Sequence, residues 1–120
     1  MNPAAPLIVT ALLPADLQSW ANALRKRHFP PERNFLDAHV TLFHALPPSC
    51  AAELVDLLAG LCSTTPACPA RLAGVMSLGR GTALHLSSPA LLALRDNIAD
   101  CLHGMLSAQD IHRPKLHITV

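Results

Sequence analysis

The chain repeats one pattern of segments, and this repeat is the strongest constraint on its fold. The stretches VTALLPADLQSW and ALHLSSPALLAL each run from a short apolar, strand-like segment into a helix that begins near Pro-Ala. The histidine of AHVTL lies 25 residues after the proline of the first stretch, and the histidine of LHITV lies 28 residues after the proline of the second. We infer two copies of one strand–helix–strand unit, spanning residues 6–46 and 82–120.

The local patterns predict an α+β fold in a single domain over residues 1–120. With 120 residues and 51% hydrophobic content, the chain has material for one compact core and too little length for two. The predicted elements are strands at 6–14, 38–46 and 116–120, a hairpin at 71–88, and helices at 14–29, 47–62 and 88–106.

Proline and serine mark the predicted helix starts. Pro14 is expected at the first position of the first helix, and Ser49 and Ser88 are expected to cap the second and third helices. In the first helix the basic run 25–27 is interpreted as a solvated face near the helix C-terminus. The apolar stripe expected to face the core consists of Leu17, Trp20, Ala21 and Leu24.

Composition excludes several classes of function. The net charge of +1 argues against a surface that holds long nucleic acids by neutralising phosphates, and 3% aromatic content argues against a base-stacking platform. Apolar runs are far shorter than the roughly 20 residues that span a bilayer, and the first residues lack the basic region of a signal peptide. The expected location is therefore the cytoplasm.

The cysteines and most of the histidines suggest no metal site. The spacing includes neither a C-x-x-C pair nor an H-E-x-x-H motif, so zinc is not expected. Free, buried thiols are the favoured interpretation for the four cysteines, which are Cys50, Cys62, Cys68 and Cys101.

Each repeat ends in a strand that carries a histidine and a threonine two residues apart. Because residues i and i+2 share one face of a strand, His39 points with Thr41, and His117 points with Thr119, away from apolar neighbours. One H-x-T match is a weak signal, whereas two at equivalent places are much stronger. We expect the two strands to face each other across a cleft; the alternative is a pair of core-edge histidines bonded to threonine or backbone.

The two motifs and the residues around them resemble those of a known family. HVTL and HITV, together with HFPPERNFLDAHVTLFHALP and the ending RPKLHITV, are similar to the two-histidine phosphoesterase superfamily and especially its 2′-5′ RNA ligase-like branch. The resemblance implies a bilobal, pseudo-two-fold fold of antiparallel sheets with flanking helices, and a cleft between the lobes that holds both motifs. It further implies hydrolysis of 2′,3′-cyclic phosphates or 2′-5′ phosphodiesters of RNA ends or small nucleotides, without a metal or other cofactor.

Carried over residue by residue, the resemblance makes His39 and His117 the catalytic histidines and Thr41 and Thr119 the phosphate-binding hydroxyls. Two imidazoles can divide the work, because one can take a proton from water while the other gives one to the leaving oxygen. The threonine hydroxyls can donate to the non-bridging phosphate oxygens. Our hypothesis makes His117 the general base and His39 the general acid, with the swapped roles as an alternative.

Residues flanking the motifs are secondary candidates. Arg113 and Lys115 lie just before the second motif, where a cation could approach the substrate phosphate or simply be solvated. Arg80 is expected at an exposed hairpin tip. His44 falls on the strand face opposite His39, which favours a structural role.

The sequence ends one residue after Thr119, whereas members of the family normally continue with further strands. An incomplete second lobe, with residues 116–120 as an exposed edge strand, would favour a homodimer formed through that strand. Two alternatives to an enzyme therefore stay open. One is a non-catalytic module that binds nucleotides or RNA ends, and the other is a truncated form that works as a dimer or with a partner.

Overall fold

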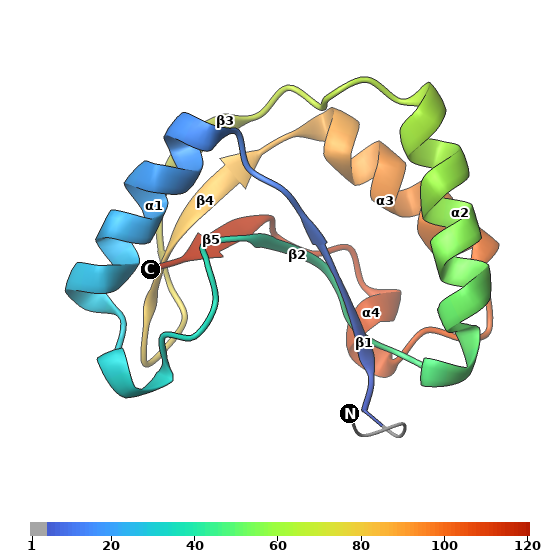
Figure 1. Cartoon of the computed structure of the whole chain (residues 1–120), viewed down its shortest axis with the longest axis horizontal. Helices are drawn as coiled ribbons and strands as arrows, with labels where there is room; N and C mark the ends of the chain where they lie inside the picture. Colours follow the sequence, from blue (N-terminus) through green and yellow to red (C-terminus); the bar gives the residue numbers. More distant parts are fainter. Residues whose placement is uncertain (1–4) are drawn as a thin grey trace. The chain divides into compact units, whose positions relative to one another are not determined.

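The fold is α+β, with a five-stranded antiparallel sheet and three main helices (Figure 1). The structure is a computed structural model that describes residues 5–120. Its strand order is β1-β2-β5-β4-β3. The strands are β1 (Leu7–Ala11), β2 (Val40–Leu46), β3 (Arg71–Ser77), β4 (Thr82–Ser87) and β5 (His117–Thr119). The helices are α1 (Ala15–His28), α2 (Ala51–Thr64), α3 (Pro89–Cys101) and the short α4 (Ala108–Ile111), with 3-10 turns at Pro31–Arg33 and Pro48–Cys50.

The chain divides into two compact units. The first contains residues up to 9 together with 42–70 and 88–114, and the second contains residues 10–41, 71–87 and 115–120. The predicted single domain stays a prediction, and its first four residues lie outside the described part of the chain. The division matters for function because both histidine motifs fall in the second unit.

In the second unit, β5 is an interior strand. Val40 of β2 pairs with Ile118 of β5, and Leu84 of β4 pairs with the same residue from the other side. Both pairings are antiparallel, and Figure 1 shows β2, β5 and β4 as neighbours. The expectation of an exposed edge strand at 116–120 was therefore wrong, and with it the homodimer through that strand. The C-terminal sequence pattern cannot reveal this, because pairing partners come from distant parts of the chain.

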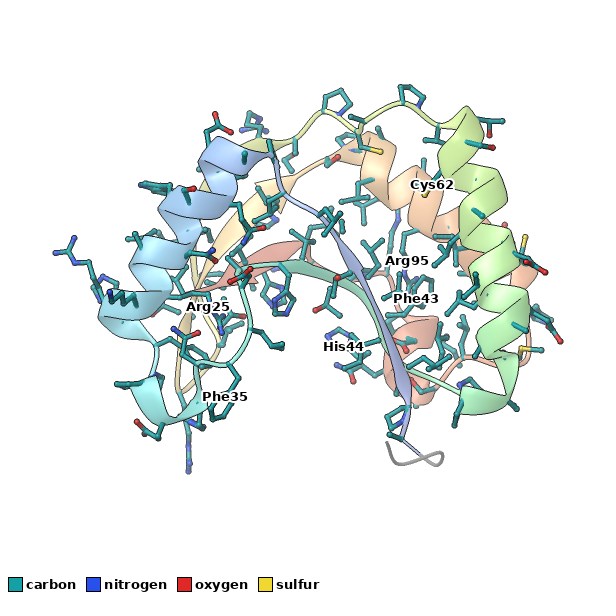
Figure 2. The ribbon with its side chains drawn as sticks, in the orientation of Figure 1. Arg25, Phe35, Phe43, His44, Cys62 and Arg95 are labelled. Atoms are coloured by element: carbon teal, nitrogen blue, oxygen red, sulfur yellow. The ribbon has the colours of Figure 1, made fainter. Side chains whose placement is uncertain are left out.

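Helix α1 differs from its predicted form in three respects. Pro14 is the N-cap residue, one position before the helix, and Trp20 is 46% exposed although it was expected to face the core. Arg25, expected on a solvated face, is only 5% exposed. Figure 2 shows Arg25 on the side of α1 that faces the strands. The buried residues of α1 are therefore Ala21 and the charged Arg25, and apolar periodicity does not predict the burial of an arginine.

In the first unit, α2 and α3 start in different ways. Ser88 caps α3 as predicted, since its hydroxyl accepts a hydrogen bond from the Leu91 N–H at 3.2 Å, and Pro89 occupies the first turn. Ser49 does not cap α2, because Pro48–Cys50 forms a 3-10 turn and Cys50 takes the N-cap position. The two prolines before Ser49 thus lead into the helix through a tighter turn.

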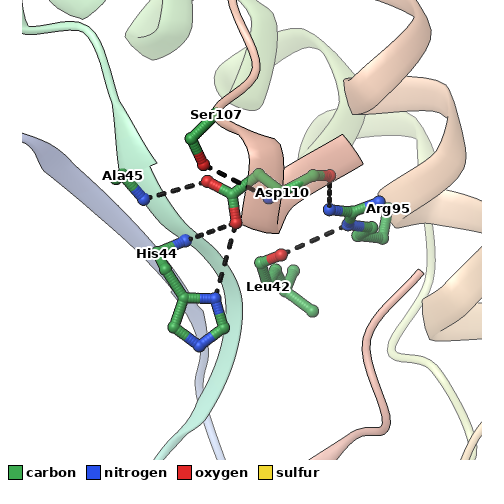
Figure 3. A network of polar contacts seen from close by, with 6 residues as sticks. All are labelled: Leu42, His44, Ala45, Arg95, Ser107 and Asp110. Atoms are coloured by element: carbon green, nitrogen blue, oxygen red, sulfur yellow. Dashed lines mark hydrogen bonds and ion pairs between the residues drawn. The ribbon is translucent and has the colours of Figure 1, made fainter. Parts of the chain in front are cut away.

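A buried carboxylate fixes the end of β2 in the first unit (Figure 3). Asp110 of α4 is 1% exposed and accepts hydrogen bonds from the His44 and Ala45 N–H groups, each at 2.9 Å. Its backbone carbonyl accepts from Arg95, which also donates to the Leu42 carbonyl at 3.2 Å. Helix α4 was not predicted, because a four-residue helix gives no periodic signal.

The cysteines are free, as expected, but they are not all buried. Cys50 is buried, whereas Cys62 and Cys101 are exposed and Cys68 is half-buried. The expectation of buried thiols was thus wrong for the cysteines at the solvent-facing side of the helices. Separately, none of the helices among residues 5–120 has the length and apolar character needed to cross a membrane.

Candidate active site

The two motifs meet where β2 pairs with β5, and His39 immediately precedes β2. Val40 is directly opposite Ile118, so continuing the antiparallel ladder by one residue places His39 opposite Thr119 and Thr41 opposite His117. Each histidine thereby faces the threonine of the other motif. The expectation that the two strands face each other across a cleft was wrong, since they are paired within one sheet.

Burial alternates along both strands as the motif requires. Val40 and Ile118 are buried, at 1% and 0% exposure, while His39, Thr41, His117 and Thr119 are all half-buried. Alternate side chains of a strand point to opposite faces. The four motif side chains therefore share the face opposite the apolar pair, which confirms the predicted alternation.

The two histidines are diagonal neighbours across the strand pair. Positions related in this way lie about 7–8 Å apart, with side chains that can approach further. That spacing leaves room for one phosphate group between the imidazoles, with a threonine hydroxyl beside each ring. The arrangement can thus present two imidazoles and two hydroxyls to one phosphorus atom.

Each imidazole is held by the same local contact. The His39 Nδ1 lies 2.7 Å from the Asp37 carbonyl oxygen, and the His117 Nδ1 lies 2.8 Å from the Lys115 carbonyl oxygen. A carbonyl oxygen can only accept, so Nδ1 carries the proton in both rings. The Nε2 atom of each ring is then the one left for chemistry, as a lone pair when the ring is neutral and as an N–H donor when it is charged.

Helix α1 holds the backbone next to the first motif. The Asn22 Oδ1 accepts from the Ala38 N–H at 2.7 Å, and the Gln18 Nε2 donates to the Ala38 carbonyl at 2.8 Å. Gln18 also donates to Asn22 at 3.0 Å, so the two side chains form one connected clamp. Both hydrogen-bonding groups of Ala38 are satisfied before β2 begins, which fixes the residue that directly precedes His39.

The same helix holds the second motif through Arg25. The Arg25 Nη1 donates to the Thr119 carbonyl at 2.8 Å, its Nε donates to Asn34 Oδ1 at 3.3 Å, and its guanidinium carbon lies 4.2 Å from the centre of the Phe29 ring. Burial lowers the pKa of Arg25, and the negative charge of Asp37 opposes that shift. Since Gln18, Asn22 and Arg25 all project from α1, one helix positions the backbone of both motifs.

A third histidine lies in the row of the second motif. His85 of β4 is the direct cross-strand partner of His117 of β5, and it is half-buried. Sequence reasoning placed His85 in a strand but did not connect it with the site. The alternation of side chains along one strand does not predict which residue lies opposite His85, because the register between β4 and β5 is set only when the sheet forms.

The secondary candidates have different surroundings. Lys115 is exposed and contributes its carbonyl to His117. Arg113 belongs to the first unit, where its guanidinium forms an exposed ion pair with Asp96 at 2.9 Å. His44, also in the first unit, lies 3.4 Å from a buried Asp110 oxygen, which matches the predicted structural role.

An apolar cavity of about 720 Å³ lies on the other face of the second unit. Leu24 and Phe29 line it from the end of α1, and Leu84 and Val75 line it from the strands. Leu84 and Val75 share the row of Ile118, so this cavity opens on the face opposite the motif side chains. Thr119 and Val120 also line the cavity, whereas His39, Thr41 and His117 do not.

No cluster of three or more potential metal ligands occurs among residues 5–120. The donor set of the site is two imidazoles and two hydroxyls on adjacent strands. Hydroxyls and imidazoles in this pattern suit an anionic group with developing charge.

Comparison with known proteins shows which family the chain belongs to. A search of the curated proteins found no match to this chain. The family model described as the 2′-5′ RNA ligase superfamily matches residues 13–120, a range that includes both histidine motifs, helix α1 and β4. The chain therefore belongs to the 2′-5′ RNA ligase superfamily of two-histidine phosphoesterases.

Proposed function

We propose that the protein is a cytoplasmic phosphodiesterase that hydrolyses the 2′,3′-cyclic phosphate, or a 2′-5′ phosphodiester, of RNA ends or small nucleotides without a metal ion. The observation that carries this proposal is the matched pair of histidines, each with its Nδ1 tied to the carbonyl two residues earlier. Membership of the superfamily supports phosphoesterase chemistry in general.

The reaction divides between the two rings. One neutral imidazole takes a proton from the attacking water at its Nε2, and the other, charged, donates its Nε2 proton to the ribose oxygen that leaves phosphorus. The P–O bond to water forms as the P–O bond to that ribose oxygen breaks, so the ring opens to a phosphomonoester. We assign His117 as base and His39 as acid; the swapped assignment uses the same atoms.

The threonines stabilise charge at phosphorus. If the register of Val40 with Ile118 is continued in both directions, Thr41 comes opposite His117 and Thr119 comes opposite His39, so that each hydroxyl is beside a ring and on the same face. Hydroxyl donors aimed at the non-bridging oxygens strengthen as negative charge develops there. Arg113 and Lys115 remain proposed phosphate contacts at the second motif.

The bilobal, pseudo-two-fold arrangement is part of the same proposal. Its support is the sequence repeat and the reciprocal register of the two motifs, in which each histidine is opposite the threonine of the other. The proposal does not require a lobe for each motif, because both motifs belong to one unit.

The test is hydrolysis of a nucleoside 2′,3′-cyclic phosphate in the presence of EDTA. We expect the wild type to turn over, and we expect His39→Ala and His117→Ala each to lose about 10²-fold or more, the scale of a lost general acid or base. His103→Ala is the matched control, because His103 is exposed and lies in the other unit. Loss of activity in EDTA that zinc or magnesium restores would overturn the metal-independent mechanism.

A folded wild type without turnover would point to the second candidate, a module that binds nucleotides or RNA ends through the same four residues. Calorimetric titration with a nucleoside 3′-phosphate distinguishes such a binding module from a protein that does not bind nucleotides. Binding that His39→Ala and Thr119→Val both weaken would support the binding module, and no binding would reject both candidates.

A further inference from the structure

The backbone hydrogen bonds show how closely His85 approaches His117. The Leu86 N–H donates to the Leu116 carbonyl at 2.9 Å, and the Val120 N–H donates to the Thr82 carbonyl at 3.0 Å. Hydrogen-bonded and non-hydrogen-bonded pairs alternate along an antiparallel ladder. The pair of His85 with His117 lies between bonded pairs and is therefore a non-hydrogen-bonded pair.

This type of pair brings side chains closest together. Cα atoms are about 4.5 Å apart in a non-hydrogen-bonded pair, compared with about 5.5 Å in a bonded one. His85 therefore stands directly beside His117, on the face that also carries Thr41, and the row across the sheet reads Thr41, His117, His85. The active-site face is thus extended by one imidazole toward β4.

The side of His85 that faces away from His117 is open. Its partner on β3 is Gly74, which has no side chain and a φ of +136° beside a register shift in the strand. A Cβ built on Gly74 would meet nothing within 4 Å. Bulges of this kind are common next to active sites, where they change the direction of a strand. The row therefore ends in free space that can hold part of a ligand.

The His85 imidazole is not held by a polar contact among residues 5–120. No hydrogen bond or ion pair within that part of the chain involves its ring, in contrast to His39, His44 and His117. The segments that surround it, 71–87 and 115–120, contain two arginines and one lysine and no acidic residue. The local charge therefore favours an anion over a cation.

We propose that His85 binds a second phosphate of the substrate, the 5′-phosphate of the nucleotide whose 2′,3′-cyclic phosphate is cleaved. The inference rests on the proposed function and narrows its substrate class from nucleosides to nucleotides that carry a 5′-phosphate, as the last nucleotide of an RNA chain does. His117 then faces the reacting phosphate, and His85 meets the next anionic group on the β4 side.

The experiment compares two substrates that differ in one group, a nucleoside 2′,3′-cyclic phosphate and the same nucleoside 2′,3′-cyclic phosphate with a 5′-phosphate. We expect the wild type to prefer the 5′-phosphorylated substrate by about tenfold in kcat/KM, the scale of one charge-assisted hydrogen bond. His85→Gln should abolish this preference by lowering kcat/KM for the 5′-phosphorylated substrate to the level of the nucleoside substrate. His85→Arg, which keeps donors and positive charge, should retain the preference.

Two controls separate the proposal from its alternatives. Arg80→Gln removes an exposed cation from the turn between β3 and β4 and should leave the preference intact. Thermal unfolding of each variant checks that the sheet is unchanged. Equal rates of the wild type on both substrates would overturn the proposal, and so would a His85→Gln variant that slows both substrates alike.

Failure of the proposed hydrolysis is a distinguishable result. If the wild type turns over neither substrate, calorimetric titration with a nucleoside 3′-phosphate and a nucleoside 3′,5′-bisphosphate measures the same preference without chemistry. Tighter binding of the bisphosphate that His85→Gln removes would still support the second phosphate site. Equal binding of the two ligands, or no binding of either, would reject it.

Discussion

Arg25 donates a hydrogen bond of 2.8 Å to the carbonyl oxygen of Thr119, and thereby connects the last turn of α1 to the backbone of the second motif. The contact spans 94 positions of sequence. Because Thr119 presents its side chain to the motif face while its carbonyl is held by α1, the helix can set the position of a hydroxyl that it does not touch.

Replacing Arg25 should therefore lower both stability and activity. Arg25→Met leaves the Thr119 carbonyl and the Asn34 side chain without this donor, at a cost of about 1–3 kcal/mol in the free energy of unfolding. We expect kcat for cyclic phosphate hydrolysis to fall with little change in KM, because the loosened strand would affect charge stabilisation at phosphorus more than ground-state binding. Denaturant unfolding and steady-state kinetics measure the two effects.

Lys26→Met is the matched control for Arg25→Met, because Lys26 is the exposed neighbour of Arg25 on α1. It should change neither stability nor kcat. Arg25→Lys should recover part of the stability but not the bond to Asn34, since lysine lacks the planar fork. Unchanged kcat in a folded Arg25→Met protein would show that Thr119 is positioned without this contact.

The hydroxyl of Thr119 can be tested apart from its volume. Thr119→Val keeps the shape and the strand preference but removes the donor, and we expect a loss of about 10²-fold in kcat, as for one lost oxyanion donor. Thr119→Ser keeps the donor and should retain most of the activity. Equal activities of the valine and serine variants would argue that phosphate is stabilised by other groups.

Stability below neutral pH should depend on Asp110. Burial acts to raise the pKa of Asp110, but the hydrogen bonds from the His44 and Ala45 N–H groups and from the His44 ring lower it, and the net shift is downward. A carboxyl with a lowered folded-state pKa contributes stability above its unfolded pKa, about 3.9, and loses it as the pH falls through the folded value.

Asp110→Asn should accordingly destabilise the protein at pH 7 by about 1–3 kcal/mol, since two backbone donors lose a charged acceptor. The difference between wild type and variant in the free energy of unfolding should become smaller as the pH falls below about 4. Urea unfolding at pH 7, 4 and 3 measures it. A gap that stays constant over this range would mean that Asp110 is not ionised in the folded protein.

Arg113 can be tested against its ion-pair partner. The pair with Asp96 is exposed on both sides, so Arg113→Gln and Asp96→Asn should each change the free energy of unfolding by less than about 1 kcal/mol. If Arg113 contacts the substrate phosphate, Arg113→Gln raises KM, whereas Asp96→Asn frees the guanidinium and leaves KM the same or lower. If both variants changed KM in the same direction and by a similar factor, Arg113 would have a structural role and would not contact the phosphate.

Local sequence patterns predicted most of the elements, because their signals involve neighbouring residues. The Ser88 cap and the hairpin around Gly79-Arg80-Gly81 were confirmed, as was the alternation of His39 with Thr41. Capping, turn formation and strand parity each depend on a few consecutive residues. The same locality explains why α4, with four residues, gave no signal.

The sequence by itself determined that the chain carries a strand–helix–strand pattern twice. It also determined that each copy ends in a histidine motif with the threonine on the same face as the histidine. Only the tertiary structure decided that these strands are paired with each other, that β5 is an interior strand, that Arg25 is buried against Thr119, and that His85 stands beside His117. The physical reason is that strand parity is a local property, whereas strand order and register are set by packing between segments far apart in sequence.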